Sequence, residues 1–168
     1  DLRGRVLAGR YRLDEIVGCG GTALVYAARD LLLRRRVAVK VFHPEHARSE
    51  PQRRQLRREA RLLAHLEHPH IVSLIDFGEE PQTLLAAGAS PQPGEAALVC
   101  AGDPLVFLVM PLLRAPTLRD LVLAGALAWP RALALVLQLL AAVATLHRRG
   151  MLHRDLKSQN CLVTRRDG

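Results

Sequence analysis

The chain has 168 residues, of which 49% are hydrophobic, and it carries a formal net charge of +8. A hydrophobic fraction of this size excludes a mainly disordered chain and suffices for one domain, or for one lobe and part of a second. The positive charge raises the question of a nucleic-acid partner. However, of the 24 basic residues only Lys40 and Lys157 are lysines, and the arginine-rich stretch 48–61 contains no aromatic residue on which bases could stack. We therefore expect no nucleic-acid partner.

The spacing of the cysteines and the hydropathy of the chain indicate the cellular compartment in which the protein is expected. Cys19, Cys100 and Cys161 lie far apart and form no Cys-x-x-Cys pair, which indicates a reducing compartment and no zinc site. The most apolar run, residues 132–146, is interrupted by Gln138 and is too short to span a bilayer, so we expect a buried helix there. The sequence thus predicts a soluble cytoplasmic protein without a membrane partner, and it does not indicate an oligomeric state.

Residues 10–43 alternate in the way that strands do. In the segment 36–42 the valines occupy one side, while Ala38 and Lys40 belong to the other side. The glycine cluster at 18–21 predicts a tight turn between the first two strands.

The period changes to that of a helix at residues 50–66. Pro51 is tolerated in the first turn of a helix, and His68-Pro69 ends the segment. Glu59 lies beside the apolar stripe of this helix, which consists of Leu56, Ala60 and Leu63.

The remaining elements complete the expected fold class. Strands are expected at 71–77 and 105–111, separated by a long loop insertion at 79–104 that is rich in Gly, Ala, Pro and Ser. A helix capped by Thr117 is expected at about 117–124, and a second helix that begins with Pro130 is expected at about 130–149. The order strands, helix, strands, helices predicts an α+β fold in two sections.

Residues 17–25 form a glycine-rich segment, Val-Gly-Cys-Gly-Gly-Thr-Ala-Leu-Val. Glycines let a backbone approach phosphate oxygens and present N–H groups to them. A dinucleotide-binding fingerprint would open a helix, whereas a strand is expected here, so that interpretation fails. Taken alone, a plain hairpin turn is at least as good an interpretation.

Lys40 and Glu59 form a second candidate pair. An inward lysine between apolar neighbours must find a counter-charge or an anion, and Glu59 on the following helix is the expected partner. Each residue also has an ordinary alternative, since Lys40 suits the solvent face of an edge strand and Glu59 suits the surface of a charged helix.

The segment 153–160 reads His-Arg-Asp-Leu-Lys-Ser-Gln-Asn and gathers a carboxylate, an ammonium and an amide on one short loop. Asp155 can accept a hydroxyl proton and orient the nucleophile. Lys157 can neutralise charge on a phosphoryl group during transfer, and Asn160 can offer an oxygen to a metal ion. A purely structural loop has no need of these residues in this order.

This segment resembles the catalytic loop of eukaryotic-type protein kinases, whose pattern is His-Arg-Asp-Leu-x-x-x-Asn. The segment 18–25 resembles the Gly-rich loop of the same family, the segment 37–40 resembles its Val-Ala-Ile-Lys strand, and Glu59 falls where the helix-C glutamate belongs. Lys157 is typical of Ser/Thr rather than Tyr kinases. The resemblance runs from about Tyr11 to Thr164.

The resemblance implies a protein-kinase-like fold, with an N-lobe and hinge at 1–113 and the start of a C-lobe at 114–168. It implies ATP and Mg²⁺ as cofactors, a protein substrate with Ser or Thr, and phosphoryl transfer in the complete protein. Asp155, Lys157, Lys40 and Glu59 would be the catalytic residues, and Asn160 would bind the metal. Arg154 beside Asp155 is the arrangement of kinases regulated by activation-loop phosphorylation. The residues expected to bind ATP are Val17, Gly18, Gly20, Gly21, Val25, Ala38, Lys40, Met110, Leu113 and Leu162.

Some positions depart from the family pattern. Ala23 stands where the third glycine is usual, and Pro111 stands in the hinge where an acidic residue is common. No Asp-Phe-Gly follows the catalytic loop before Gly168, so we expect a fragment of a longer chain. The alternative function is a catalytically inactive kinase-fold binding or scaffold protein, and a small-molecule phosphotransferase of related fold is less consistent with Lys157.

Overall fold

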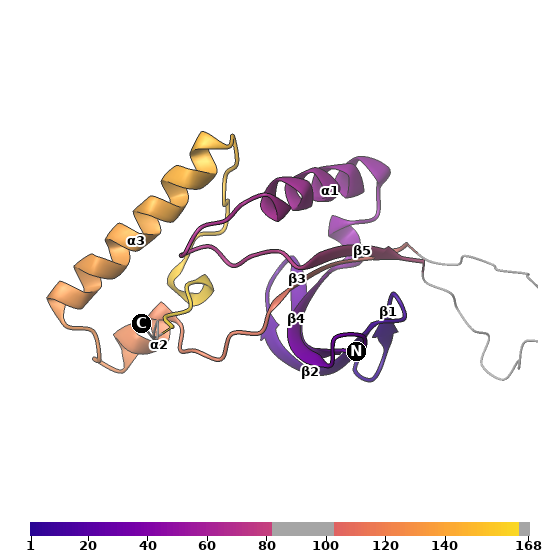
Figure 1. Ribbon diagram of the computed structural model, residues 1–168, viewed down its shortest axis with the longest axis horizontal. Helices are drawn as coiled ribbons and strands as arrows, with labels where there is room; N and C mark the ends of the chain where they lie inside the picture. Colours follow the sequence, from indigo (N-terminus) through magenta and orange to yellow (C-terminus); the bar gives the residue numbers. More distant parts are fainter. Residues whose placement is uncertain (82–102, 165–168) are drawn as a thin grey trace, which may run out of the picture.

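The computed structural model describes residues 1–81 and 103–164. Its described part contains a six-stranded antiparallel sheet in the order β1-β2-β3-β4-β6-β5, with helix α1 packed beside it (Figure 1). The strands are β1 (Val6–Leu7), β2 (Tyr11–Cys19), β3 (Ala23–Asp30), β4 (Arg35–Phe42), β5 (Asp76–Glu80) and β6 (Leu105–Pro111). Strand β1 was not expected from the sequence, because two residues are too few to show a period.

The predicted phase of strand β4 is confirmed. Val37 and Val39 are fully buried in the core of the sheet, whereas Ala38 and Lys40 face the opposite side. One face of β4 therefore packs in the core, and its other face is available to line a binding site. The buried apolar residues that form it are Leu7, Tyr11, Leu13, Tyr26, Ala28, Val37, Val39, Val41, Leu105, Phe107 and Val109.

Helix α1 (Glu50–Ala64) begins where its caps dictate. The Ser49 side chain accepts a hydrogen bond from the backbone N–H of Gln52, and the Gln52 side chain accepts one from the Ser49 N–H. This reciprocal capping satisfies two backbone donors that the first helical turn leaves free. The helix ends two residues before the predicted residue 66.

The strand predicted at 71–77 is wrong in its first part. Residues 71–75 are not in a strand, and β5 comprises Asp76–Glu80, although the Ile75 N–H already donates to the Val109 carbonyl at 2.8 Å. Residues 71–73 instead line a large cleft, so the apolar side chains of Ile71 and Val72 belong to the wall of this cleft and not to the sheet. The loop predicted at 79–104 accordingly starts later, because Glu79 and Glu80 pair with β6. The part of this loop at 82–102 lies outside the described residues.

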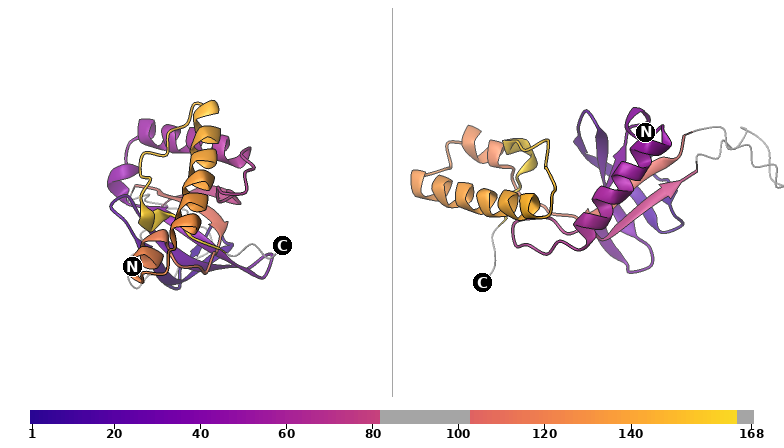
Figure 2. Two further views of the ribbon diagram at one scale, coloured as in Figure 1. Left: turned by 90° about the vertical axis from the view of Figure 1, so that its left-hand side faces the viewer. Right: turned by 90° about the horizontal axis from the view of Figure 1, so that it is seen from above.

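The second section of the chain is helical. Helix α2 (Leu118–Leu123) starts with a capping box formed by Thr117 and Asp120, and helix α3 (Trp129–Arg148) stands well away from the sheet (Figure 2). An isolated bridge between Thr117 and Leu162 joins the start of α2 to the end of the described chain. Both helices were predicted to within one residue at each end.

The prediction that α3 is buried is wrong for the described structure. Ala142 and Leu146 are its buried residues, whereas apolar side chains such as Leu137 and Leu140 are 58% and 59% exposed. Few described residues pack against this helix, which leaves its apolar surface open. Helix α3 is longer than the apolar run 132–146 from which it was predicted, and its 20 residues are long and apolar enough to cross a membrane by length and composition alone. Core helices of soluble proteins share these properties, so this is weak evidence for a membrane.

Candidate active site

A cleft of about 2450 Å³ opens between the sheet with α1 and the segments that surround α2 and the end of α3. We call it the main cleft. Every residue that the sequence nominated for catalysis, ATP binding or metal binding lines it, which brings together residues as far apart in the chain as Val17 and Leu162. These residues are Val17, Gly18, Gly20, Gly21, Val25, Ala38, Lys40, Glu59, Met110, Leu113, Asp155, Lys157, Asn160 and Leu162.

The sheet supplies one wall of the main cleft through cross-strand pairing. Val25 of β3 lies opposite Lys40 of β4, and Ala38 of β4 lies opposite Met110 of β6. Residues paired in this way project from the same face of a sheet. Apolar side chains therefore flank an ammonium group on this wall, which suits a ligand with a flat apolar part and an anionic part. Leu162 reaches the cleft from the opposite side through its bridge to Thr117.

Lys40 is half-buried, and burial lowers the pKa of its ammonium group because desolvation disfavours the charge. Two negative side chains, Asp155 and then Glu59, act in the opposite direction and raise the pKa. The ammonium also lies 5.3 Å from the centre of the Phe42 ring. Lys40 is thus held in a site that favours an anionic ligand.

The predicted ion pair between Lys40 and Glu59 is not formed among the described residues. The Glu59 carboxylate lies 3.7 Å from Nη1 of Arg154 and accepts a hydrogen bond from Gln55 at 3.1 Å. Arg154 has a positive φ of 60°, a backbone conformation that side chains rarely adopt. The catalytic-loop arginine therefore takes the carboxylate that the sequence assigned to Lys40, and Glu59 acts on Lys40 through its charge.

The predicted catalytic loop forms a compact network. Nζ of Lys157 lies 2.8 Å from Oδ1 of Asp155, and Nδ2 of Asn160 donates to Oδ2 of Asp155 at 2.8 Å. These donors lower the pKa of Asp155, with the Lys157 contact as the largest cause. Asp155 is consequently an ionised acceptor near neutral pH.

Asn160 also fits the metal role expected from the sequence. Its Nδ2 donates to the backbone and side-chain oxygens of Asp155, so its Oδ1 is left as an acceptor. Amide and carboxylate oxygens are the ligands that Mg²⁺ takes in proteins. Within residues 1–81 and 103–164, no group of three or more His, Cys, Asp or Glu side chains is placed to hold a metal ion.

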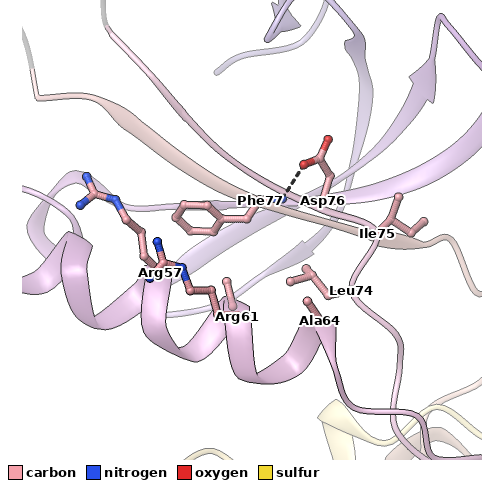
Figure 3. Close-up of a pocket in the computed structure, with 8 residues that line it drawn as sticks. Arg57, Arg61, Ala64, Leu74, Ile75, Asp76 and Phe77 are labelled. Atoms are coloured by element: carbon pink, nitrogen blue, oxygen red, sulfur yellow. Dashed lines mark hydrogen bonds between the residues drawn. The ribbon is translucent and has the colours of Figure 1, made fainter.

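The letters Asp-Phe-Gly occur once in the chain, at Asp76-Phe77-Gly78, far ahead of the catalytic loop. The Asp76 carboxylate accepts a hydrogen bond from the Tyr11 hydroxyl at 2.6 Å and one from the Phe77 N–H at 2.8 Å. Asp76 lines a separate cavity of about 350 Å³ between α1 and the segment 74–77, and Figure 3 shows its carboxylate pointing away from α1. Asp76 does not line the main cleft, so this triplet is a structural part of β5 and not a metal-binding motif.

Sequence reasoning overlooked two contacts at the main cleft. One is the contact of Arg154 with Glu59, and the other is a pair of histidines, His43 and His46, that bind the backbone of the glycine-rich turn. The position of Arg154 beside Asp155 was a signal that it lies near the site. No sequence period connects the histidines to a turn more than 20 residues away.

The comparison with family models identifies the class of protein. The family model described as "Protein kinase domain" matches residues 11–168, which is nearly the whole chain, so the chain belongs to the protein kinase domain family. The kinase-like fold and the membership predicted from the sequence are confirmed.

Individual relatives agree with this family. The chain is 32% identical over 163 residues to the serine/threonine-protein kinase PrkC of Bacillus subtilis, covering 96% of this chain and 22% of that protein. It is 37% identical over 159 residues to the serine/threonine-protein kinase PknB of Mycobacterium tuberculosis, covering 94% of this chain and 22% of that protein. The chain thus spans about a fifth of these relatives.

A solved structure confirms the fold. The crystal structure of the Mycobacterium tuberculosis PknI kinase domain matches with a TM-score of 0.73 and 25% sequence identity, over 99% of this chain and 60% of that chain. The division predicted at residues 113 and 114 is not tested by these comparisons and stays a prediction.

Proposed function

We propose that the complete protein transfers the γ-phosphoryl group of ATP to Ser or Thr hydroxyls of protein substrates. The observation that carries this proposal is the meeting of three sequence motifs on one cleft, with Lys40 on the sheet and Asp155 on the catalytic loop. Membership of the protein kinase domain family supports it. The named relatives are Ser/Thr kinases, which favours that substrate class.

The chain's own residues divide the work of binding ATP. The backbone at Gly18, Gly20 and Gly21 suits the phosphates, because glycine lets the main chain approach closely. Lys40 suits the negative charge of the same phosphates from the sheet wall. Val25 and Ala38, with Leu162 opposite, suit the two faces of an adenine ring.

The catalytic loop orients the substrate hydroxyl and neutralises charge on the phosphoryl group. Asp155, kept ionised by Lys157 and Asn160, accepts the hydrogen bond of the substrate hydroxyl and orients it. Lys157 also neutralises charge on the phosphoryl group. ATP supplies that phosphoryl group, and Mg²⁺ at the Asn160 oxygen would neutralise phosphate charge when bound. Most of the rate then comes from positioning and electrostatic stabilisation.

The location and the partner are part of the proposal. We place this domain in the cytoplasm, because Cys19 and Cys161 are free thiols and suit a reducing compartment. A protein substrate suits a catalytic loop that carries Lys157. The alternative, a kinase-fold binding protein without turnover, has no need of Lys40, Asp155 and Asn160 on one cleft.

Transfer of radiolabel from γ-labelled ATP to a protein substrate tests the function in the complete protein. Lys40→Met and Asp155→Asn should each abolish transfer and leave the thermal unfolding midpoint unchanged. Asp14→Asn, which removes a carboxylate that does not line the main cleft, is the matched control and should transfer label normally. Substantial transfer by Asp155→Asn would refute its role, and ATP binding by the wild type without transfer would favour the binding protein.

A further inference from the structure

Two histidine side chains bind the backbone of the glycine-rich turn. Nε2 of His43 lies 3.0 Å from the carbonyl oxygen of Gly20, and Nε2 of His46 lies 3.2 Å from that of Gly21. A carbonyl oxygen only accepts, so each ring donates from a protonated Nε2. The two rings therefore hold two successive peptide groups of the turn.

The same segment holds a third carbonyl of the turn. The His43 backbone N–H donates to the Thr22 carbonyl at 2.9 Å, while within the turn the Gly20 N–H donates to Ala23 at 3.0 Å. The turn is exposed and contains adjacent glycines, whose backbone loses more conformational freedom on ordering than that of any other residue. The contacts from His43 and His46 therefore add to the one internal hydrogen bond in limiting the conformations of the turn.

The histidine segment is itself anchored to helix α1. His46 is the last residue of a short 3₁₀ helix, Pro44–His46, and the carbonyl of Glu45 accepts a hydrogen bond from the Gln52 side chain at 3.0 Å. Gln52 belongs to the capping box of α1, and the next residue, Ala47, is buried. The rings are therefore fixed relative to the helix that carries Glu59.

Peptide planarity converts these contacts into an orientation of the turn's N–H groups. In a trans peptide the C=O and the following N–H point in opposite directions. Binding of the Gly20 and Gly21 carbonyls thus orients the N–H groups of Gly21 and Thr22 to the other side. The residues of the turn line the main cleft, whereas neither histidine does, so the rings bind from outside it.

We propose that His43 and His46 are positioning residues that hold the glycine-rich turn with its N–H groups directed at the phosphates of ATP. This inference rests on the proposed function for its ligand, but the histidine contacts exist without nucleotide. It predicts that the histidines matter for the phosphate part of the ligand and not for the adenosine part.

The test uses the complete protein with both histidines changed to leucine, and with both changed to glutamine, whose amide is again a donor. His147→Leu is the control, because His147 is exposed on α3 and does not line the main cleft. Without nucleotide, hydrogen exchange of residues 18–25 should be faster in the leucine variant and restored in the glutamine variant. Unchanged exchange in the leucine variant overturns the proposal whether or not ATP binds.

Binding constants then separate this inference from the proposed function. For an ATP analogue with a non-hydrolysable β–γ linkage, loss of two hydrogen bonds should weaken binding about five- to twentyfold. Adenosine should bind the leucine variant as it binds the wild type. An equal loss for both ligands would show a merely structural role. A wild type that binds neither ligand would contradict the proposed function and leave the exchange result to decide on the histidines.

Discussion

Nη1 of Arg154 lies 3.7 Å from Oε1 of Glu59, so a carboxylate of helix α1 contacts the loop that also carries Asp155. Both side chains are well exposed, at 65% and 44%, and a pair of this kind contributes at most ~1 kcal/mol to stability. Glu59 matters more through its charge, because it also raises the pKa of Lys40 without contacting it.

Changing Glu59 to Gln should lower the pKa of Lys40 further, because it removes one of the two negative charges that oppose the effect of burial. Reductive ¹³C-methylation followed by NMR titration measures this pKa cleanly, since the chain has only one other lysine, Lys157. Glu67→Gln is the control and should leave the titration of Lys40 where it is. A Lys40 pKa that stays the same or rises in Glu59→Gln would contradict the assigned charge effect.

Changing Lys157 to Met should raise the pKa of Asp155 toward its ordinary value of about 3.9, because the largest cause of the depression is removed. The chemical shift of the Asp155 carboxyl carbon, followed by NMR against pH, measures the midpoint. Asn160 still donates to Asp155, so the return should be incomplete. Arg119→Met serves as a remote control, and an unmoved midpoint in Lys157→Met would refute the pairing.

Changing Gly78 to Ala should destabilise the sheet. A Cβ at this position would lie 2.2 Å from Cζ of Phe107, a ring that is 1% exposed and packed in the core. Overpacking of this kind costs about 1–3 kcal/mol of unfolding free energy, measured by urea denaturation. Gly21→Ala is the matched control, since a Cβ there meets nothing within 4 Å, and its stability should be nearly unchanged. Equal stability of the two variants would mean that Phe107 moves aside freely.

Changing Asp30 to Asn should destabilise the protein, and the loss of unfolding free energy should be larger at neutral pH than at acidic pH. Asp30 is fully buried, and Arg10 donates to its two oxygens at 2.9 and 2.8 Å. Because the Arg10 guanidinium holds the pKa of this carboxyl well below its usual range, the carboxylate stabilises the fold above the unfolded pKa of about 3.9. That stabilisation is lost as the pH falls toward the folded pKa.

Urea midpoints of the wild type and of Asp30→Asn should therefore differ most near pH 7 and converge below about pH 4. The solvent-exposed pair of Asp14 and Arg12 supplies the comparison, and Asp14→Asn should change the midpoint little at either pH. A difference between wild type and Asp30→Asn that grows with acidity would show the opposite sign of linkage.

Much of the local structure was readable from the sequence. Pro51 and Thr117 indicated the starts of α1 and α2, and the alternation around Lys40 assigned its side chain to the face away from the core. These features depend on neighbours within a few residues, which is the range that period and capping describe. The strand start at Ile71 failed because apolar residues that line a cleft and apolar residues in a sheet look alike in one dimension.

The sequence by itself determined the order of the motifs, the family and the residues that gather at the main cleft. Tertiary structure alone decided the partners that charged and polar groups take from distant parts of the chain. Glu59 meets Arg154, Asp76 meets Tyr11, and His43 meets Gly20, and each pair joins residues more than 20 positions apart. A local sequence pattern does not predict the distance between such residues, because that distance depends on how the sheet, α1 and the catalytic loop pack together.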